Sequence, residues 1–164
     1  MNEDFQYLPD SHCYAIYSSS KKLIGYIRAL KWNNCDILPI VKDFNVDLGS
    51  FISGLRPSPD EVWHIGRFVI DQEEIRHDEK LMNKRITILK LLLFCAFTHI
   101  ANAKNGIALA ECDSKLYTKL KLLGIDSTVI GKSQMYFGSE TIPIYNTSTG
   151  VRNFVESNKS ICYV

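Results

Sequence analysis

The sequence predicts a mixed α/β fold, with a mostly antiparallel sheet that includes one parallel pair of strands. Two β-prone runs near the N-terminus are typical of a hairpin, because the polar stretch 18–22 separates them. A strand at 62–70, a long helix and a strand at 107–111 form a β-α-β unit, whose right-handed crossover leaves its two strands parallel. Short β-prone runs after residue 127 predict antiparallel closing strands.

The length and charge of the chain limit what it can be. It has 164 residues and a formal net charge of +1. This length suits one domain with a sizeable core, so we expect a single domain over residues 1–164, with a poorly ordered leading segment at 1–12 and a C-terminal tail at 150–164. Near-neutrality does not favour nucleic-acid binding, which normally goes with a basic excess.

The cysteines and the apolar runs predict the location of the protein. Five cysteines, an odd number with no CxxC pair, indicate reduced thiols, a cytoplasmic location and no metal site. The acidic N-terminus lacks the positive and apolar regions of a signal peptide. The most apolar run, 86–103, carries Lys90, His99 and Asn102, so we interpret it as a buried helix and expect no membrane span.

In the N-terminal half, strands are predicted at 13–17 and 23–32. The segment 38–44 suits either a short helix or an extended crossing. Residues 45–59 contain two glycines and two prolines and are therefore predicted to be a loop. Loops of about this length often line functional sites when they are ordered.

In the C-terminal half, two helices alternate with strands. The helix at 83–103 has only a narrow polar stripe, which predicts packing against a face of the sheet. Asp113 or Ser114 caps a second helix at 114–123, and Gly124 ends it.

The strand at 62–70 is rich in β-branched and aromatic residues, with Gly66 inside it. A glycine within a strand suggests a bulge or the close approach of another group to the backbone. Because side chains alternate along a strand, His64 and Gly66 point one way, while Trp63 and Arg67 point the other unless the bulge re-aims them.

Four stretches carry a family resemblance when they are taken in order. They are Gly25-Tyr-Ile-Arg-Ala-Leu30, similar to a G-x-x-R-L-L strand; residues 38–44, similar to the segment that follows; Trp63-His-Ile-Gly-Arg-Phe-Val-Ile70, similar to an E-x-S-R-F-A-V strand; and Leu120-Lys-Leu-Leu-Gly-Ile125 with Ile130-Gly131 and Gly138, similar to a helix and closing strands. Together they resemble the acyl-homoserine lactone synthases, or autoinducer synthases, a branch of the GNAT acyltransferase superfamily. The resemblance implies a GNAT-like sheet whose central parallel pair is splayed, with helices packed on its faces.

The sequence also departs from that family. About a dozen residues precede the first strand, so we expect the family's N-terminal lobe, which holds S-adenosylmethionine, to be absent or reduced. His64 stands where the family has a glutamate and Gly66 where it has a serine, whereas Arg28 and Arg67 match. The resemblance implies an acyl thioester as co-substrate, on CoA or on the phosphopantetheine of an acyl carrier protein, and no tightly bound cofactor.

The candidate catalytic residues lie on or beside the strand at 62–70. Attack of an amine on a thioester needs a base and stabilisation of the oxyanion. His64 is the preferred base, because an imidazole changes charge near neutral pH; the alternative is a hydrogen-bonded structural histidine. Glu61 is a second candidate base or a solvated strand end.

Backbone and guanidinium groups complete the predicted site. The backbone around Gly66, Phe68 and Val69 is the candidate surface for the thioester and the oxyanion. Arg28 shares a strand face with apolar neighbours and needs a partner. We predict a structural or acceptor-side role for Arg28 and Arg67.

The donor's phosphate is expected near a basic segment. Residues 72–84 contain no glycine, so they lack the glycine-rich loop with which GNAT enzymes usually hold the pyrophosphate of CoA. The basic candidates for a phosphate or carrier-protein surface are Arg76, Lys80, Lys84 and Arg85. The alternative is a solvated charged loop, because acidic residues are interleaved with them.

Aromatic residues are the candidate walls of an acyl pocket, with core packing as the alternative for each. They are Trp32, Trp63, Phe68, Phe94 and Phe97.

Two further residues have a chemical and a structural interpretation. Tyr117 resembles the GNAT tyrosine that protonates the leaving thiolate, but it stands about one turn too early, which favours packing. Cys112 is a candidate nucleophile or, more simply, a buried thiol.

Two functions fit these observations. The first is an N-acyltransferase that moves an acyl group from acyl carrier protein or acyl-CoA to a small amine, with an acyl carrier protein or a second copy of the chain as compatible partners. The second is a non-catalytic GNAT-like module that binds an acyl ligand or a protein partner.

Overall fold

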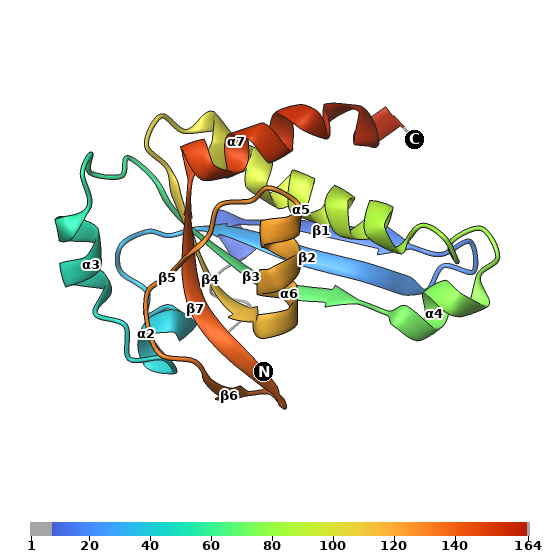
Figure 1. Cartoon of the computed structure of the whole chain (residues 1–164), viewed down its shortest axis with the longest axis horizontal. Coiled ribbons are helices and arrows are strands. Elements are labelled where there is room, and N and C mark those ends of the chain that lie inside the picture. The colour runs from blue at the N-terminus through green and yellow to red at the C-terminus, as the bar shows by residue number, and fades with distance from the viewer. Residues whose placement is uncertain (1–7, 164) are drawn as a thin grey trace.

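The computed structural model describes residues 8–163, and Figure 1 shows how their helices and strands surround one sheet. Along the chain the elements are η1 (Leu8–Asp10), β1 (Ser11–Tyr17), β2 (Leu23–Lys31), α2 (Pro39–Lys42), α3 (Leu48–Gly54), β3 (Val62–Ile70), α4 (Gln72–His77), α5 (Arg85–Asn102), β4 (Ile107–Asp113), α6 (Ser114–Leu122), β5 (Thr128–Val129), β6 (Gln134–Tyr136), β7 (Ser139–Thr147), α7 (Ser148–Ser157) and η2 (Lys159–Tyr163).

The sheet has the strand order β1-β2-β3-β4-β7-β5, with β6 paired to β7. Its pairings are antiparallel except between β3 and β4, which run parallel. That parallel pairing joins residues 62–64 only to residues 107–109, after which the two strands diverge, as Figure 1 shows. The predicted sheet, mostly antiparallel with a splayed central parallel pair, is therefore confirmed.

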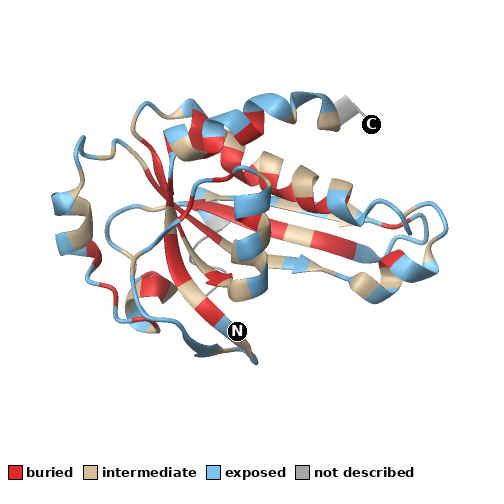
Figure 2. Ribbon diagram, in the orientation of Figure 1, coloured by how far each residue is buried: buried red, intermediate tan, exposed pale blue. Residues whose placement is uncertain are grey.

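Helices cover both faces of this sheet. On one face, α5, α6 and α7 pack over a core that includes Trp63 of β3. On the other face, α2 and α3 pack over a second core that includes Val62 of β3 and Leu109 of β4. Figure 2 shows buried residues along the strands and on the side of α5 that faces them. Because alternate residues of a strand face opposite ways, His64 and Glu111 lie on the α2 face.

Helix α5 is the central element of the first core. It packs against β1, β2 and β3, and also against α7. In the described part of the chain, α5 alone has the length and apolar composition of a membrane span, and 44% of that stretch is buried. The central helix of a packed core meets the same criteria, and each fully buried leucine of such a helix contributes about 1.5–3 kcal/mol.

One prediction of an irregular segment was wrong, and one helix in the predicted C-terminal tail was not foreseen. The predicted loop 45–59 contains α3, which begins where the Asp47 side chain accepts a hydrogen bond from the Ser50 backbone N–H. The predicted tail 150–164 is mostly α7, capped by the Thr147 hydroxyl, which accepts from the Gly150 N–H. Both caps are ordinary N-terminal helix signals, and they outweigh the glycines nearby.

The predicted leading segment 1–12 overlaps the first two described elements. Strand β1 begins at Ser11, and the short helix η1 precedes it. Residues 1–7, which that prediction also covered, lie outside the described residues.

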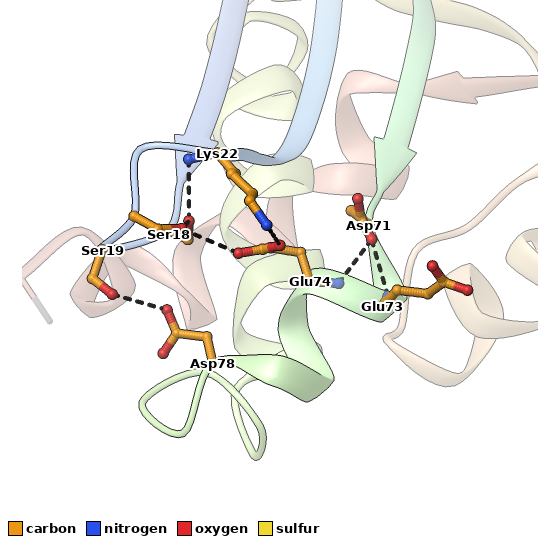
Figure 3. A network of polar contacts seen from close by, with 8 residues as sticks. Ser18, Ser19, Lys22, Asp71, Glu73, Glu74 and Asp78 are labelled. Carbon is orange, nitrogen blue, oxygen red and sulfur yellow. Dashed lines mark hydrogen bonds and ion pairs between the residues drawn. The ribbon is translucent and has the colours of Figure 1, made fainter.

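A polar network holds the β1–β2 turn against α4, as Figure 3 shows. The Lys22 ammonium lies 2.8 Å from Glu74, and the hydroxyls of Ser19 and Ser20 donate to Asp78 and Glu74 at 3.2 Å. Asp71 caps α4 by accepting from two of its backbone N–H groups. Exposed pairs of this kind contribute little to stability because solvent screens them, so the network mainly orients α4 at the end of β3.

Candidate active site

The opening between β3 and β4 leads into a cavity of about 660 Å³ that joins the two faces of the sheet. Apolar side chains form much of its lining on the α5 side, and polar side chains form much of its lining on the α2 side. The apolar residues include Leu89, Leu93, Phe97, Leu116, Leu120 and Ile144, and the polar ones include Arg28, Asp43, His64, Arg67, Glu111 and Tyr136. Cavities of this size and mixed character commonly bind small molecules.

His64 lies at the point where β3 and β4 part. It pairs with Leu109 across the parallel strands, so Glu111, two residues further along β4, projects on the same face beyond the last paired position. The Nε2 atom of His64 lies 2.9 Å from Glu111 Oε2, and the imidazole is only 2% exposed. If Nε2 donates to the carboxylate, Nδ1 presents a lone pair, and it has no hydrogen-bond partner among the described residues.

Glu111 was missed by the sequence prediction. The signal was a carboxylate inside a buried strand, next to the predicted helix cap at Asp113. Buried carboxylates are rarely unpaired, so this position alone indicated a polar partner.

Gly66 makes room for the imidazole. A Cβ atom at position 66 would lie 2.9 Å from His64 Cε1 and 3.4 Å from Nδ1. Side chains two residues apart on a strand share a face, so any side chain here would displace the ring. Because it has no side chain, Gly66 leaves the space that the His64 ring occupies.

The bulge predicted at Gly66 lies one residue later. Arg28 of β2 pairs with Gly66 and Tyr26 pairs with Val69, so β3 holds one more residue than β2 between these pairs. Arg67 has a left-handed backbone with φ of 54°, which costs a non-glycine residue roughly 1–2 kcal/mol. The prediction that the bulge sits at Gly66 was therefore wrong by one position.

The bulge also changes which way Arg67 points. Strict alternation would send Arg67 away from His64, whereas in the structure it lines the same cavity. Its charge lowers the pKa of Tyr136, partly offsetting larger effects in the other direction. His64 and Arg67 therefore share one site.

Arg28 is also brought to this cavity. It pairs with Gly66 across the antiparallel strands, and directly paired residues project from the same face. The residue is only 6% exposed and lines the cavity beside the imidazole.

Tyr136 and Asp43 form a second polar pair that the sequence prediction did not include. The Tyr136 hydroxyl donates to Asp43 Oδ2 at 2.9 Å, and the side chain of Gln134 donates to the Asp43 carbonyl at 2.7 Å. Burial, followed by the hydrogen bond to Asp43, raises the pKa of Tyr136 to about 12. Both Tyr136 and Asp43 line the cavity, so β6 and α2 close its polar side together.

The structure does not bring Glu61 to this site. Its carboxylate pairs with Lys31 and accepts from Trp63 Nε1 at 3.0 Å. The hydrogen bond from Lys31 is the main cause that lowers the pKa of Glu61. Glu61 does not line the cavity that holds His64.

Among the predicted acyl-pocket residues, Phe97 and Phe68 line the cavity, whereas Trp32, Trp63 and Phe94 do not. Trp32 donates to the Asp36 carbonyl at 2.8 Å, and Trp63 stacks on His99.

The helical period decides which residues of α5 form the apolar wall of the cavity. It is made by Leu89, Leu93 and Phe97, which are four residues apart and so share one face, while Phe94 lies about 100° around the helix.

Only one of the predicted basic residues lines the cavity. Arg85, at the start of α5, lines the cavity, whereas Arg76, Lys80 and Lys84 do not. Two lysines of α6, Lys115 and Lys119, line it instead. The positive side of the mouth is therefore formed by α5 and α6 together.

Tyr117 and Cys112 have structural roles. Tyr117 lies outside the cavity, with its hydroxyl 3.5 Å from the Ser127 carbonyl and Lys121 over its ring. Cys112 lines the cavity, but burial raises the pKa of its thiol to about 12, so it is protonated at neutral pH and is a poor nucleophile. In the described residues, no group of three His, Cys, Asp or Glu side chains could hold a metal ion.

Comparison with known proteins places the fold. No family model and no curated protein matches the sequence. Among solved structures, FeeM, an N-acyl amino acid synthase from uncultured soil microbes, matches with a TM-score of 0.61 and 18% identity over 93% of this chain and 82% of its own. TofI in its apo form matches with a TM-score of 0.58 and 12% identity over 93% of this chain and 77% of its own.

A third structure is BjaI, a CoA-dependent acyl-homoserine lactone synthase, with SAM and isopentyl-CoA. It matches with a TM-score of 0.56 and 12% identity over 93% of this chain and 65% of its own. The chain has the fold of FeeM and the acyl-homoserine lactone synthases. The predicted resemblance to this branch of the GNAT superfamily is thereby confirmed for the fold.

Proposed function

We propose that the protein is an N-acyltransferase that moves an acyl group from a pantetheine thioester to a small amine. The observation that carries this proposal is the placement of His64. It is buried, held by Glu111, and lies where β3 and β4 part, between an apolar and a polar half of one cavity. A base at the junction of the two halves is what aminolysis of a thioester requires.

The reaction balances through His64. The amine nitrogen attacks the thioester carbon and forms the C–N bond, and Nδ1 of His64 takes one proton from that nitrogen. Glu111 stabilises the imidazolium that results. Collapse of the tetrahedral intermediate breaks the C–S bond, and the proton passes to the departing thiolate, which gives an amide and a free thiol.

The donor occupies the opening between the strands in this proposal. Beyond His64, the β4-facing edge of β3 has no strand partner in the described chain, so a pantetheine arm can pair with it as an added strand. Backbone groups of Gly66, Phe68 and Val69 then lie along the thioester and are the candidates for stabilising the oxyanion. The acyl chain lies along the apolar wall of α5.

In this proposal, the phosphate end of the donor lies at the end of the cavity that basic side chains line. Arg85, Lys115 and Lys119 line the cavity there and suit the phosphate of CoA or of an acyl carrier protein. Arg28 and Arg67 lie on the α2 face and are assigned to the acceptor side. FeeM is an N-acyl amino acid synthase and BjaI is a CoA-dependent acyl-homoserine lactone synthase, and their likeness in fold to this chain supports the proposal.

The partners of the protein and its location in the cell are predictions. An acyl carrier protein, a second copy of the chain and a cytoplasmic location are compatible with this proposal. Among the described residues, Cys13, Cys35 and Cys112 are not in disulfides.

The test is mass spectrometry of the protein incubated with a pool of amines and with acyl groups of short, medium and long chain on CoA and on acyl carrier protein. We expect an acyl-amide and one equivalent of free thiol per turnover. If the thioester is bound but never consumed, the alternative function, a non-catalytic GNAT-like module, replaces the enzyme.

Glu111→Gln and Glu61→Gln are matched variants for the same assay. Both remove one carboxylate, but only Glu111 contacts His64. We expect Glu111→Gln to lower turnover by about 10²-fold or more and Glu61→Gln to leave it near the wild-type rate. The reverse order would assign the base to Glu61.

A further inference from the structure

The cavity has a rim of side chains that are either apolar or basic. We use the word rim for the residues that line the cavity and are themselves exposed to solvent. The apolar residues of the rim are Ile37, Val69, Ile86 and Phe137, and its basic residues are Lys42, Arg67, Arg85 and Lys115. Among the described residues, no exposed side chain that lines the cavity is acidic.

The carboxylates that line the cavity are partly buried and have partners inside the protein. Asp43 accepts a hydrogen bond from Tyr136, Glu111 lies against His64, and Asp113 caps α6. The whole chain has a net charge of only +1, so positive charge is concentrated at the rim. A basic region on a nearly neutral protein attracts an anionic surface.

Phe137 is the rim residue whose position is hardest to explain by folding alone. It is 88% exposed and stands at the tip of the β6–β7 hairpin, which projects from the lower edge of the molecule in Figure 1. Tyr136 pairs with Ser139, so the loop consists of Phe137 and Gly138, with φ of 46° and 82°. A two-residue turn with positive φ at both positions is of type I′ and favours Asn-Gly. Neither the turn nor the solvent therefore favours a phenylalanine here.

The ring of Phe137 is held in a defined place. It contacts the ring of Tyr136, with 4.4 Å between centroids. Tyr136 is in turn fixed by its hydrogen bond to Asp43 and by edge-on packing against Phe44. Phe137 therefore projects from a hairpin that is fixed to α2, the helix that carries Lys42.

We propose that the rim docks the protein on an anionic phospholipid bilayer, with Phe137 inserted among the lipids and the basic side chains on the headgroups. Peripheral membrane proteins combine exposed apolar side chains with Lys and Arg in this way. A bilayer suits the rim better than a protein partner does, because fluid lipid accommodates a projecting ring without a shaped recess. This inference goes beyond the proposed acyl transfer and does not depend on it.

The first experiment measures co-sedimentation of the full chain with vesicles and needs no turnover. One set of vesicles is phosphatidylcholine alone, and the other is phosphatidylcholine and phosphatidylglycerol in equal parts. We expect affinity for the anionic vesicles to be about tenfold higher or more, and to fall as salt is added.

Two pairs of matched variants test the rim itself. Phe137→Asn should weaken binding to the anionic vesicles about tenfold, whereas Leu122→Asn, at an 83% exposed position on α6 outside the rim, should not. Lys42→Gln should weaken binding about fivefold, whereas Lys104→Gln, at an exposed position outside the cavity, should not. Phe137→Asn supplies the Asn-Gly turn, so we expect its Tm to be no lower than that of the wild type.

The inference is overturned by an absence of binding to the anionic vesicles or by equal affinity for both kinds of vesicle. It is also overturned if Phe137→Asn binds as well as the wild type, or if Leu122→Asn is weakened to the same extent. If the rim variants weaken binding to an acyl carrier protein and the wild type does not bind vesicles, the rim belongs to a protein partner instead.

The second experiment locates Phe137 in the bilayer. Phe137→Trp and Leu122→Trp are bound to anionic vesicles that contain phosphatidylcholine with brominated acyl chains, which quench nearby tryptophans. We expect quenching beyond that of the wild type, whose own tryptophans are Trp32 and Trp63, in Phe137→Trp and not in Leu122→Trp. Equal quenching of the two variants, or none above the wild type, would overturn insertion at the hairpin tip.

Discussion

The two sides of β3 carry nearly the same set of side chains but differ in what those side chains leave available. On the α2 side, His64 is paired with Glu111, and Tyr136 lines the same cavity. On the α5 side, His99 lies beside Tyr14, and Glu61 is close by. Each side therefore holds a histidine, a tyrosine and a glutamate.

On the α5 side every group is used in packing. The Tyr14 hydroxyl lies 2.6 Å from His99 Nε2, and the His99 ring stacks on His12 and Trp63 with centroid distances of 4.1 Å and 5.0 Å. None of these side chains lines the cavity that His64 faces.

On the α2 side the same residue types leave one buried ring nitrogen, Nδ1 of His64, without a hydrogen-bond partner among the described residues. The carboxylate holds one nitrogen of His64, and Gly66 clears the space beneath the ring. The comparison teaches that histidine, tyrosine and glutamate do not make a site by their presence. A site requires that one of their polar atoms be buried, oriented and left without an internal partner.

The largest expected effect distinguishes the two histidines directly. His64→Gln removes the base and should lower turnover by about 10²- to 10⁴-fold, because general-base catalysis contributes that much. His99→Gln should leave turnover near the wild-type rate, since His99 does not line the cavity. Initial rates of thiol release from the acyl donor measure both. Equal losses in the two variants would remove the distinction between the two sides.

A second prediction concerns Gly66, which leaves space for the His64 ring. Gly66→Ala should lower turnover by about 10²-fold, because the new methyl group displaces the imidazole from its position. Gly54→Ala is the matched control, since a Cβ there meets no atom within 4 Å. Thiol-release rates and unfolding curves of both variants are compared. Full activity in Gly66→Ala would show that the ring tolerates the displacement.

A third prediction concerns stability on the α5 side. Burial, and then the charge of His12, lower the pKa of His99 from its ordinary value of 6.5. The unfolded chain therefore binds a proton at this residue more readily than the folded chain does, so its contribution is intact above about pH 6.5 and declines as the pH falls. We expect Tm to fall less steeply between about pH 7 and pH 5 in His99→Gln than in the wild type. Parallel Tm curves would contradict this.

The smallest expected effect concerns Cys112. Its thiol has a pKa raised to about 12 by burial, whereas Cys13 and Cys35 are exposed. Iodoacetamide at about pH 8 should alkylate the two exposed thiols much faster than Cys112, as peptide mass mapping would reveal. Cys112→Ala should change turnover by no more than a few-fold. A complete loss of turnover would restore Cys112 as a nucleophile.

Much of the fold was predictable because its signals are local. The strand at 62–70 has the predicted bounds, and Asp113 caps α6 by accepting from the N–H groups of Lys115 and Leu116. Two helices were missed although Asp47 and Thr147 supply N-cap hydroxyl or carboxylate groups of the same kind. The prediction gave the nearby glycines and prolines more weight than the N-cap residues, although the N-cap residues decide the structure here.

The candidate site was predictable only in part. His64, Arg28 and Gly66 were identified from one strand and its neighbour, and the structure brings them together. Glu111 and Tyr136 come from strands that no local pattern connects to His64. Trp63 was assigned to an acyl pocket, yet alternation along β3 turns it to the other face.

The sequence by itself determined the order of strands and helices, the strand that carries the histidine, and the alternation that separates His64 from Trp63. These follow from propensity, capping and period, which act over a few residues. Only the tertiary structure decided that Arg67 lines the same cavity as His64, because the bulge after Gly66 depends on the register with β2. It also decided that Glu111 lies against His64 and that Asp43 accepts a hydrogen bond from Tyr136, since those partners lie far apart in the chain and meet only when the sheet closes around the cavity.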